Sequence, residues 1–356
     1  MLASIAAAAL LAAAGSVTDI SLGDENPHVR HAAAMLATAG RPAYDPWFDT
    51  DHRVRIPTYN TPLWHAGLAL LWGAAGADLP PGQPVQVSRG LQVLAQAYHA
   101  GFYLLGVLCV YFAARRLGGA SAATWAWLLV ATLPMAAAYS VLLFQDVPGL
   151  AVSALAVLLL TRRRFAAAGV ALAAAYLTKM NMLSFAPWLV AWAPAWAGPG
   201  WKRRLRAAAL VAVPVAAAFA YDLAWRLDAY EPPRRLTGMR QITFEQVRAS
   251  GELSDAALRA FTDKPAGYVY WQPFTVSDPA AIAANVGLTL LAAGVVALVR
   301  AWDRRSLWLW LGVGITAAAF WGVFGRLGSV QVRYLLPVLL PLALLGARAL
   351  RRWRLP

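Results

Sequence analysis

Apolar residues along the chain are gathered into ten long stretches, and short basic or polar segments separate them. A helix that crosses the hydrocarbon core needs about 20 apolar residues, and shorter helices are tolerated where neighbouring helices surround them. The pattern therefore predicts an all-α protein, a polytopic transmembrane helical bundle of about ten spans. The predicted spans are 2–20, 91–113, 122–142, 147–161, 165–178, 182–198, 207–225, 281–300, 306–325 and 333–349.

One further apolar stretch, PLWHAGLALLWGAAG at 62–76, is shorter than a typical span. We expect it to form an interfacial helix on the outer side, because five basic segments then share one face of the membrane, as the positive-inside rule requires. About half of the 31 lysines and arginines lie in these segments, which place both termini in the cytoplasm. The basic segments are 115–116, 162–164, 202–206, 300–305 and 348–354.

Composition supports a membrane protein. The chain is 60% hydrophobic and 13% charged, with a mean hydropathy of +0.53, which excludes an ordinary soluble domain and a disordered chain. The net charge of +14 is explained mostly by the cytoplasmic turns, so nucleic acid is not an expected partner. The single cysteine, Cys109, excludes an intramolecular disulfide framework and a thiolate metal cluster.

The whole chain, 1–356, is predicted to form one integral membrane domain with two long outer segments, 21–90 and 226–280. Connections of this length are usually functional. The first span could alternatively be a cleaved signal peptide, although the missing basic residues before it and the later spans favour a retained helix.

Two acids, Asp24 and Glu25, directly follow the first predicted span, in the sequence GDENPHVRHA. A carboxylate held there by a rigid helix could act as a general base on a substrate hydroxyl. The alternative interpretation is that Asp24 only caps a helix that begins near Pro27. A third interpretation, in which Asp24, Glu25 and His28 bind a metal, rests on a weak spacing signal.

Other charged residues are expected at the same outer level. Asp146 lies in FQDVPG at the outer end of a short helical hairpin, and Lys179 and Asn181 lie in YLTKMNM at the partner end. Arg326 and Arg333 bracket the last outer turn, where an arginine is either an interface anchor or an anion site.

These features together resemble the GT-C superfamily of integral membrane glycosyltransferases. The resemblance covers nearly the whole chain and follows the order of its motifs: the acidic pair Asp24-Glu25, an aromatic and proline-rich loop, ARRLGG, QDVPG, LTK, and RYLLPVLLP from Arg333. The first outer loop is similar to that of the dolichyl-phosphate-glucose α-1,2-glucosyltransferase family. Tyr44-Asp45-Pro46 stands where that family has W-D-P, whereas Leu63-Trp64 departs from its P-G-L.

The resemblance implies a polyprenyl-phosphate sugar donor, a lipid-linked or other glycan acceptor, and an inverting transfer at the non-cytoplasmic face. Asp24 is then the base, with Glu25 as the alternate. Arg333 is the first choice to bind the leaving phosphate, and Asp146 would orient donor or acceptor. Further candidates for donor binding are Lys179, Arg326, Tyr334, His28 and the pair Arg234-Arg235.

No cofactor is required by this chemistry, although a divalent metal is compatible with it. The resemblance also implies a multi-pass protein of a bacterial-type inner membrane or of the endoplasmic reticulum, in contact with membrane lipid, with its active site on the periplasmic or luminal side. Two alternatives stay open: a polytopic transporter or lipid flippase, and an O-antigen ligase-type transferase. The predicted spans place few ionisable residues at mid-membrane, His99 being the main exception, which disfavours a transporter.

Overall fold

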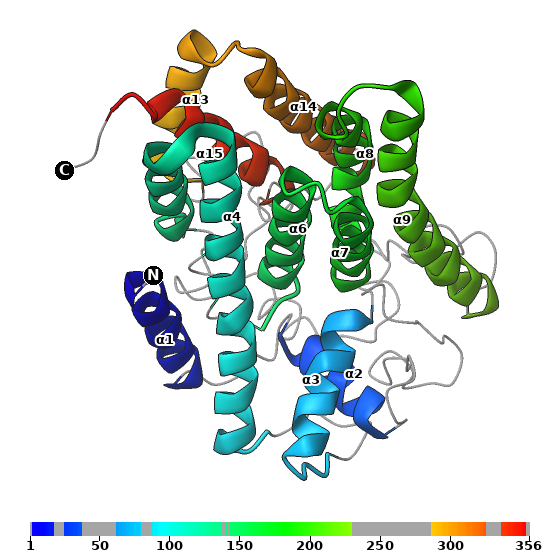
Figure 1. Cartoon of the computed structure of the whole chain (residues 1–356). Coiled ribbons are helices and arrows are strands. Elements are labelled where there is room, and N and C mark those ends of the chain that lie inside the picture. The colour runs from blue at the N-terminus through cyan, green and yellow to red at the C-terminus, as the bar shows by residue number, and fades with distance from the viewer. Residues whose placement is uncertain are drawn as a thin grey trace, which may run out of the picture.

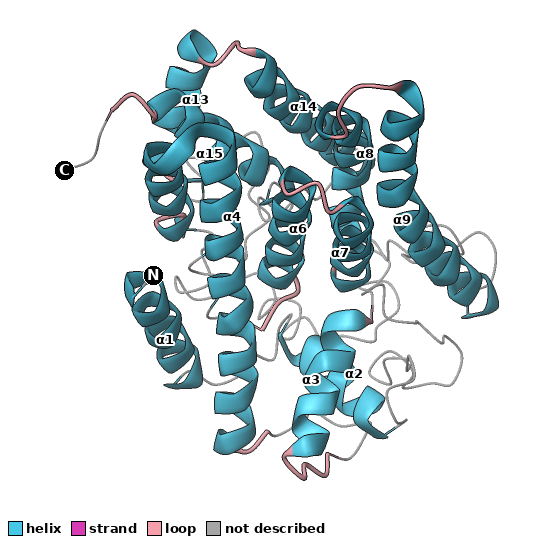
Figure 2. Cartoon of the chain, viewed as in Figure 1, coloured by secondary structure: helices cyan, strands magenta, loops and turns pink. Residues whose placement is uncertain are grey.

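The computed structural model describes residues 2–17, 25–37, 62–79, 87–134, 136, 140, 143–229, 286–324 and 336–353. Within these residues every regular element is helical (Figure 2). The elements are α1 (Leu2–Val17), α2 (Glu25–Ala37), α3 (Leu63–Ala74), α4 (Arg89–Ala131), α6 (Asp146–Thr161), α7 (Phe165–Thr178), the 3-10 helix η2 (Met180–Ser184), α8 (Phe185–Trp196), α9 (Trp201–Ala229), α13 (Leu288–Arg300), α14 (Arg304–Phe324) and α15 (Leu336–Leu350).

Each of the ten predicted apolar stretches contains a helix, so the all-α prediction is confirmed within the described part of the chain. The label α4 covers two helices, which match the stretches 91–113 and 122–142 and are divided by a kink at Gly119. Gly119 has φ 86° and ψ −171°, a conformation that is open to glycine and costly for residues with a Cβ. The glycine therefore lets the chain turn back immediately after the basic pair Arg115-Arg116 (Figure 1).

Helix length does not by itself establish ten spans. Among the described residues, two helical segments, Arg89–Ala131 and Trp201–Ala224, are long and apolar enough to cross a membrane. Several other apolar helices have 10–17 residues, so each is at most about 26 Å long. The structure thus confirms the helical bundle, and the number of crossings stays a prediction.

The bundle has two chemically different ends (Figure 1). The bend of α4 and the α6–α7, α8–α9 and α13–α14 connections lie at one end, together with the last turn of α15. These are the five basic segments of the sequence. Helices α2 and α3 lie at the opposite end, below the first residues of α6 and the last residues of α7. The side of the membrane that each end faces stays a prediction.

Helix α3 corresponds to the predicted interfacial stretch. It spans 12 residues, or about 18 Å, and packs against α2, α4 and α7. The contact with α2 buries Val29, Ala32 and Ala33 of α2 and Leu68 and Trp72 of α3 in a second, smaller apolar core, to which Ala95 of α4 and Leu143 also belong. This core fixes α2 and α3 to each other next to the main bundle.

Candidate functional site

A chain of buried polar side chains connects α2, α3 and the start of α6. His28 Nδ1 lies 3.0 Å from His65 Nε2, and Gln145 Nε2 lies 3.1 Å from His65 Nδ1. The amide nitrogen of a glutamine can only donate, so His65 Nδ1 accepts and its proton is on Nε2. His65 Nε2 therefore donates to His28 Nδ1, which leaves the proton of His28 on its Nε2. The three residues thus fix both imidazole tautomers and join the two small helices to α6.

The histidines are also packed as aromatic rings. His28 stacks on His65 with 5.3 Å between ring centroids. The rings of Trp64 and Phe144 are nearly perpendicular to that of His28, with centroids 5.9 and 5.5 Å away. The ring of His31 lies 4.1 Å from that of His65. Burial lowers the pKa of His31 to about 3, because the charged imidazolium cannot be hydrated there. His31 is therefore neutral at ordinary pH, and its ring contributes packing.

Asp146 and Lys179 form an ion pair directly beside this chain of histidines. Asp146 is the first residue of α6, where a carboxylate is stabilised by the positive end of the helix dipole. Lys179 immediately follows α7, and its Nζ donates to Asp146 Oδ2 at 3.2 Å. The Asp146 side chain is fully buried, and that of Lys179 is 13% exposed. The structure therefore brings together two of the predicted site residues from neighbouring helix ends.

A glycine permits the lysine to approach α6 so closely. A Cβ on Gly149 would lie 3.0 Å from both Lys179 Cβ and Met182 Cγ. A contact of 3.0 Å is tighter than nine in ten real Cβ contacts, so a larger residue would push Lys179 or Met182 away from α6 by a few tenths of an ångström. The Asp-Val-Pro-Gly sequence thus supplies both the carboxylate and the space for its partner.

Unsatisfied polar atoms remain at this end of the bundle. Within the described residues, Asp146 Oδ1 has no hydrogen-bond partner, and neither do the two amide atoms of Asn181 in η2. Buried polar atoms without partners are uncommon and mark places where a ligand or water binds. One carboxylate oxygen and one carboxamide are thus suited to the hydroxyls of a sugar.

The other predicted site residues are described only in part. His28 belongs to the buried polar chain, and Glu25 is the first residue of α2, with a side chain that the structure does not describe. The remaining candidates lie outside the described residues: Asp24, Arg234, Arg235, Arg326, Arg333 and Tyr334. Asp24 directly precedes α2, a position compatible with the capping interpretation and with the base interpretation alike.

The structure adds His65, Gln145 and Asp222, which were absent from the predicted site. Tyr176 Oη donates to Asp222 Oδ2 at 2.5 Å, and this bond joins α7 to α9. A signal for each was present in the sequence: a histidine inside an apolar stretch, a glutamine beside Asp146, and an aspartate inside the predicted span 207–225. Buried polar residues at such positions need partners, although the sequence does not say which.

A small apolar pocket of about 30 Å³ lies next to the polar site, between α4, α6, α13 and α15. Val147, one of its lining residues, directly follows Asp146, and Tyr103 is one helical turn from His99. The other walls include Leu150, Leu339 and Leu340. The pocket therefore places an apolar surface within one residue of the ion pair.

Comparison with solved structures shows which fold this arrangement belongs to. ArnT from Cupriavidus metallidurans bound to undecaprenyl phosphate superposes with a TM-score of 0.59 and 18% identity, over 99% of this chain and 60% of ArnT. The apo form of ArnT gives 0.58 and 18%, over 99% and 59%. The chain shares the fold of ArnT. The likeness extends to an oligosaccharyltransferase of Archaeoglobus fulgidus in complex with Zn and sulfate, with a TM-score of 0.52 and 14% identity, over 98% of this chain and 48% of that one.

The chain spans about 60% of the length of ArnT. No protein-family profile and no curated protein sequence matches the chain. The predicted resemblance is therefore confirmed at the level of the fold. Within that fold, the Asp146–Lys179 pair and the His28–His65–Gln145 chain lie together at one end of the bundle.

Proposed function

We propose that the protein is a membrane glycosyltransferase that transfers a sugar from a polyprenyl-phosphate donor to a lipid-linked or other glycan acceptor. The observation that carries the proposal is the buried Asp146–Lys179 pair beside an apolar pocket, at one end of a GT-C fold. A lipid phosphate has both a long apolar chain and an anionic head, and these two adjoining surfaces complement the two parts. Undecaprenyl phosphate is bound in one of the similar structures, that of ArnT.

The donor would bind with part of its lipid chain against the apolar surface around Val147 and Leu150, and with its phosphate near Lys179. Asp146 holds the lysine side chain in one orientation, so the ammonium is in place before the donor arrives. Fixed positive charge at the site where negative charge develops is an effective way to stabilise a leaving group. Because Asp146 balances the charge of Lys179, the net positive charge for the leaving group would come from Arg333, Arg326 and the pair Arg234-Arg235 of the outer segments.

The transfer itself is a single displacement that inverts the anomeric carbon. The acceptor hydroxyl oxygen forms a bond to C1 while the bond from C1 to the phosphate oxygen breaks, and the lipid phosphate leaves with the electron pair. Asp24 takes the hydroxyl proton, with Glu25 as the alternate base. Asp24 precedes a helix, α2, that the His28–His65–Gln145 chain joins to α6. The reaction needs no cofactor, because lysine and arginine can balance the charge of a monophosphate.

The proposal also includes a location. We expect α2 and α3 to lie on the non-cytoplasmic side, because the opposite end of the bundle carries the basic turns. In bacteria this would be the periplasmic face of the inner membrane, and in eukaryotes the luminal face of the endoplasmic reticulum. A membrane-impermeant maleimide applied to cells that carry Cys variants of residues 76 and 203 should label the first position and spare the second.

The experiment that tests the activity uses the full chain in lipid nanodiscs, a panel of polyprenyl-phosphate sugars and lipid acceptors, with the products measured by mass spectrometry. Asp24→Asn should abolish transfer while donor binding stays within about twofold, since the base acts on the acceptor. Glu25→Gln is the matched control and should retain transfer. Loss of activity in Glu25→Gln with normal turnover in Asp24→Asn would move the base to Glu25. Failure of the unmodified protein to consume any donor would refute the proposed activity.

A further inference from the structure

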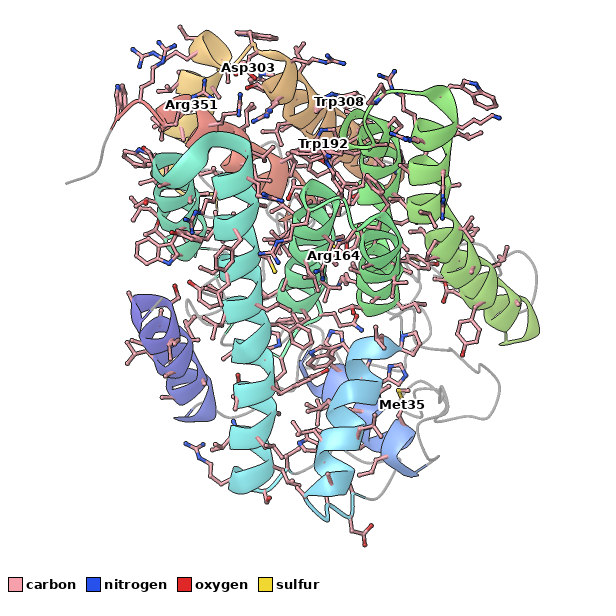
Figure 3. All side chains as sticks on the ribbon, viewed as in Figure 1. Met35, Arg164, Trp192, Asp303, Trp308 and Arg351 are labelled. Atoms are coloured by element: carbon pink, nitrogen blue, oxygen red, sulfur yellow. The ribbon has the colours of Figure 1, made fainter. Side chains whose placement is uncertain are left out.

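A second pocket, of about 430 Å³, lies at the end of the bundle opposite α2 and α3. It is formed by the α13–α14 connection and the last turn of α15. Figure 3 shows Asp303 and Arg351 at this end and Met35 of α2 at the other. The charged and aromatic residues that line the pocket are Arg300, Asp303, Arg348, Arg351, Arg352 and Trp353.

Asp303 and Arg348 give this pocket a fixed frame. Asp303 Oδ1 caps α14 by accepting from the backbone N–H groups of Arg305 and Ser306, at 3.1 and 3.0 Å. Arg348 Nη2 donates to Asp303 Oδ2 at 2.6 Å, and the same guanidinium donates to the Leu117 carbonyl beside the bend of α4. Burial opposes the charge of Asp303, but the hydrogen bonds from Arg348 and Ser306 outweigh it and hold the pKa of the carboxyl well below its usual range.

The remaining arginines leave the pocket strongly positive. Four arginines line it against one aspartate, and Arg348 already satisfies that aspartate. Arg351 Nη2 is 3.8 Å from Asp303 Oδ2, too far for a hydrogen bond, and Arg352 is exposed. The guanidinium of Arg300 lies over the ring of Trp353 at 5.2 Å. These three guanidinium groups present planar arrays of donors that match the oxygens of a phosphate.

An exposed apolar surface leads directly to this pocket. On α13, the side chains of Val295, Leu298 and Val299 are 62%, 54% and 77% exposed, and the helix ends at Arg300. Trp302 follows, half exposed and stacked on the ring of Trp310. A sequence of apolar, aromatic and then basic surface is typical of the boundary between hydrocarbon and headgroups.

We propose that this pocket binds the phosphate headgroup of an anionic phospholipid, whose acyl chains lie along the exposed face of α13. Arg300, Arg351 and Arg352 contact the phosphate, and the Asp303–Arg348 pair keeps α13, α14 and α15 in register around it. Basic pockets between membrane helices bind anionic headgroups in this manner. The proposal requires the chain to be in a membrane, as the proposed function does, but it does not depend on sugar transfer.

The test measures lipid binding by native mass spectrometry, on the full chain in an uncharged detergent, with no sugar donor present. The probes are phosphatidylglycerol, phosphatidylcholine and inorganic phosphate at equal concentrations. The unmodified protein should prefer phosphatidylglycerol, and Arg351→Gln/Arg352→Gln should weaken its binding by about 30-fold. Arg203→Gln/Arg204→Gln is the matched control, since it removes the same charge from exposed positions in another basic turn of that end, and it should change the affinity little.

Equal weakening in both double variants would overturn the proposal, because the attraction would then be a general effect of charge. Inorganic phosphate that binds as tightly as phosphatidylglycerol would also overturn it, in favour of a free-anion site. Neither Arg351 nor Arg352 takes part in the hydrogen bonds that Asp303 makes to α14 and to Arg348, so the double variant Arg351→Gln/Arg352→Gln should fold. Arg300→Gln is a further variant at the α13 side of the pocket and should weaken lipid binding in the same direction.

Discussion

Removal of Lys179 should destabilise the protein far more than removal of an exposed lysine. In Lys179→Met, the fully buried carboxylate of Asp146 would lose the cation that balances its negative charge. Breaking a buried pair by removing one partner typically costs about 3–5 kcal/mol, because the remaining charge stays buried. Lys202→Met is the control, since Lys202 is exposed in a basic turn, and it should cost less than about 1 kcal/mol.

The double variant Asp146→Asn/Lys179→Met separates stability from function. With both charges gone, no buried ion remains, and asparagine and methionine have volumes similar to those of the aspartate and the lysine that they replace. The double variant should therefore recover about 2 kcal/mol or more relative to Lys179→Met, and a double-mutant cycle gives the coupling between the two residues. Unfolding in denaturing detergent, followed by the fluorescence of the 16 tryptophans, measures these free energies.

Donor affinity should behave differently in the same variants. If Lys179 binds the leaving phosphate, Lys179→Met and the double variant should both bind the donor about tenfold or more weakly than the unmodified protein does. Recovery of donor affinity together with stability would show that the lysine only balances Asp146, and it would refute the assignment. Additive effects of the two substitutions on stability would refute the ion pair itself.

Other predictions concern single residues. Acidification from pH 6.5 to pH 5 should lower the free energy of unfolding by about 2 kcal/mol through His31, because the unfolded chain binds a proton there that the folded protein, with a pKa of about 3 at this residue, does not bind. The free energy of unfolding of His31→Gln should depend less steeply on pH, and an equal pH dependence in the two proteins would contradict this prediction. Gly169→Val should cost about 1–3 kcal/mol in chemical unfolding, because its Cβ would lie 2.5 Å from the Leu210 carbonyl oxygen, whereas Gly101→Ala has open space and should be neutral or slightly stabilising. Arg333→Ala should weaken donor binding about tenfold in an equilibrium binding assay; an unchanged affinity would assign the phosphate to other cations.

The helices were predictable because their signal is local. A span such as 165–178 is apolar along its whole length and bounded by arginines and a lysine, and the structure places α7 at those residues. The bend of α4 was partly predictable, since two glycines follow Leu117. The two separate helices that the sequence predicts there are confirmed, since the non-helical Gly119, with its positive φ, divides α4 into two helical parts.

The candidate site was less predictable because its contacts are long-range. Gln145 and His65 are 80 residues apart in sequence, and nothing local indicates that they meet. The stretch around His65 is predicted only as an interfacial helix, and nothing in its composition assigns the histidine to the site. Asp146 and Lys179 were predicted at one level because a helical hairpin of known span lengths brings its ends together, and that geometry needs no tertiary information.

The charges around the first turn of α6 also limit what the described residues can do alone. Asp146 and Lys179 balance each other's charge in their ion pair. The ion pair therefore positions a donor group without supplying net positive charge to a departing phosphate. A lipid monophosphate gains negative charge as it leaves, so the proposed displacement requires at least one further cation. The outer segments hold the arginines that could provide this cation. Substitution of Arg333 should therefore lower turnover more, relative to its effect on donor binding, than substitution of Lys179 does.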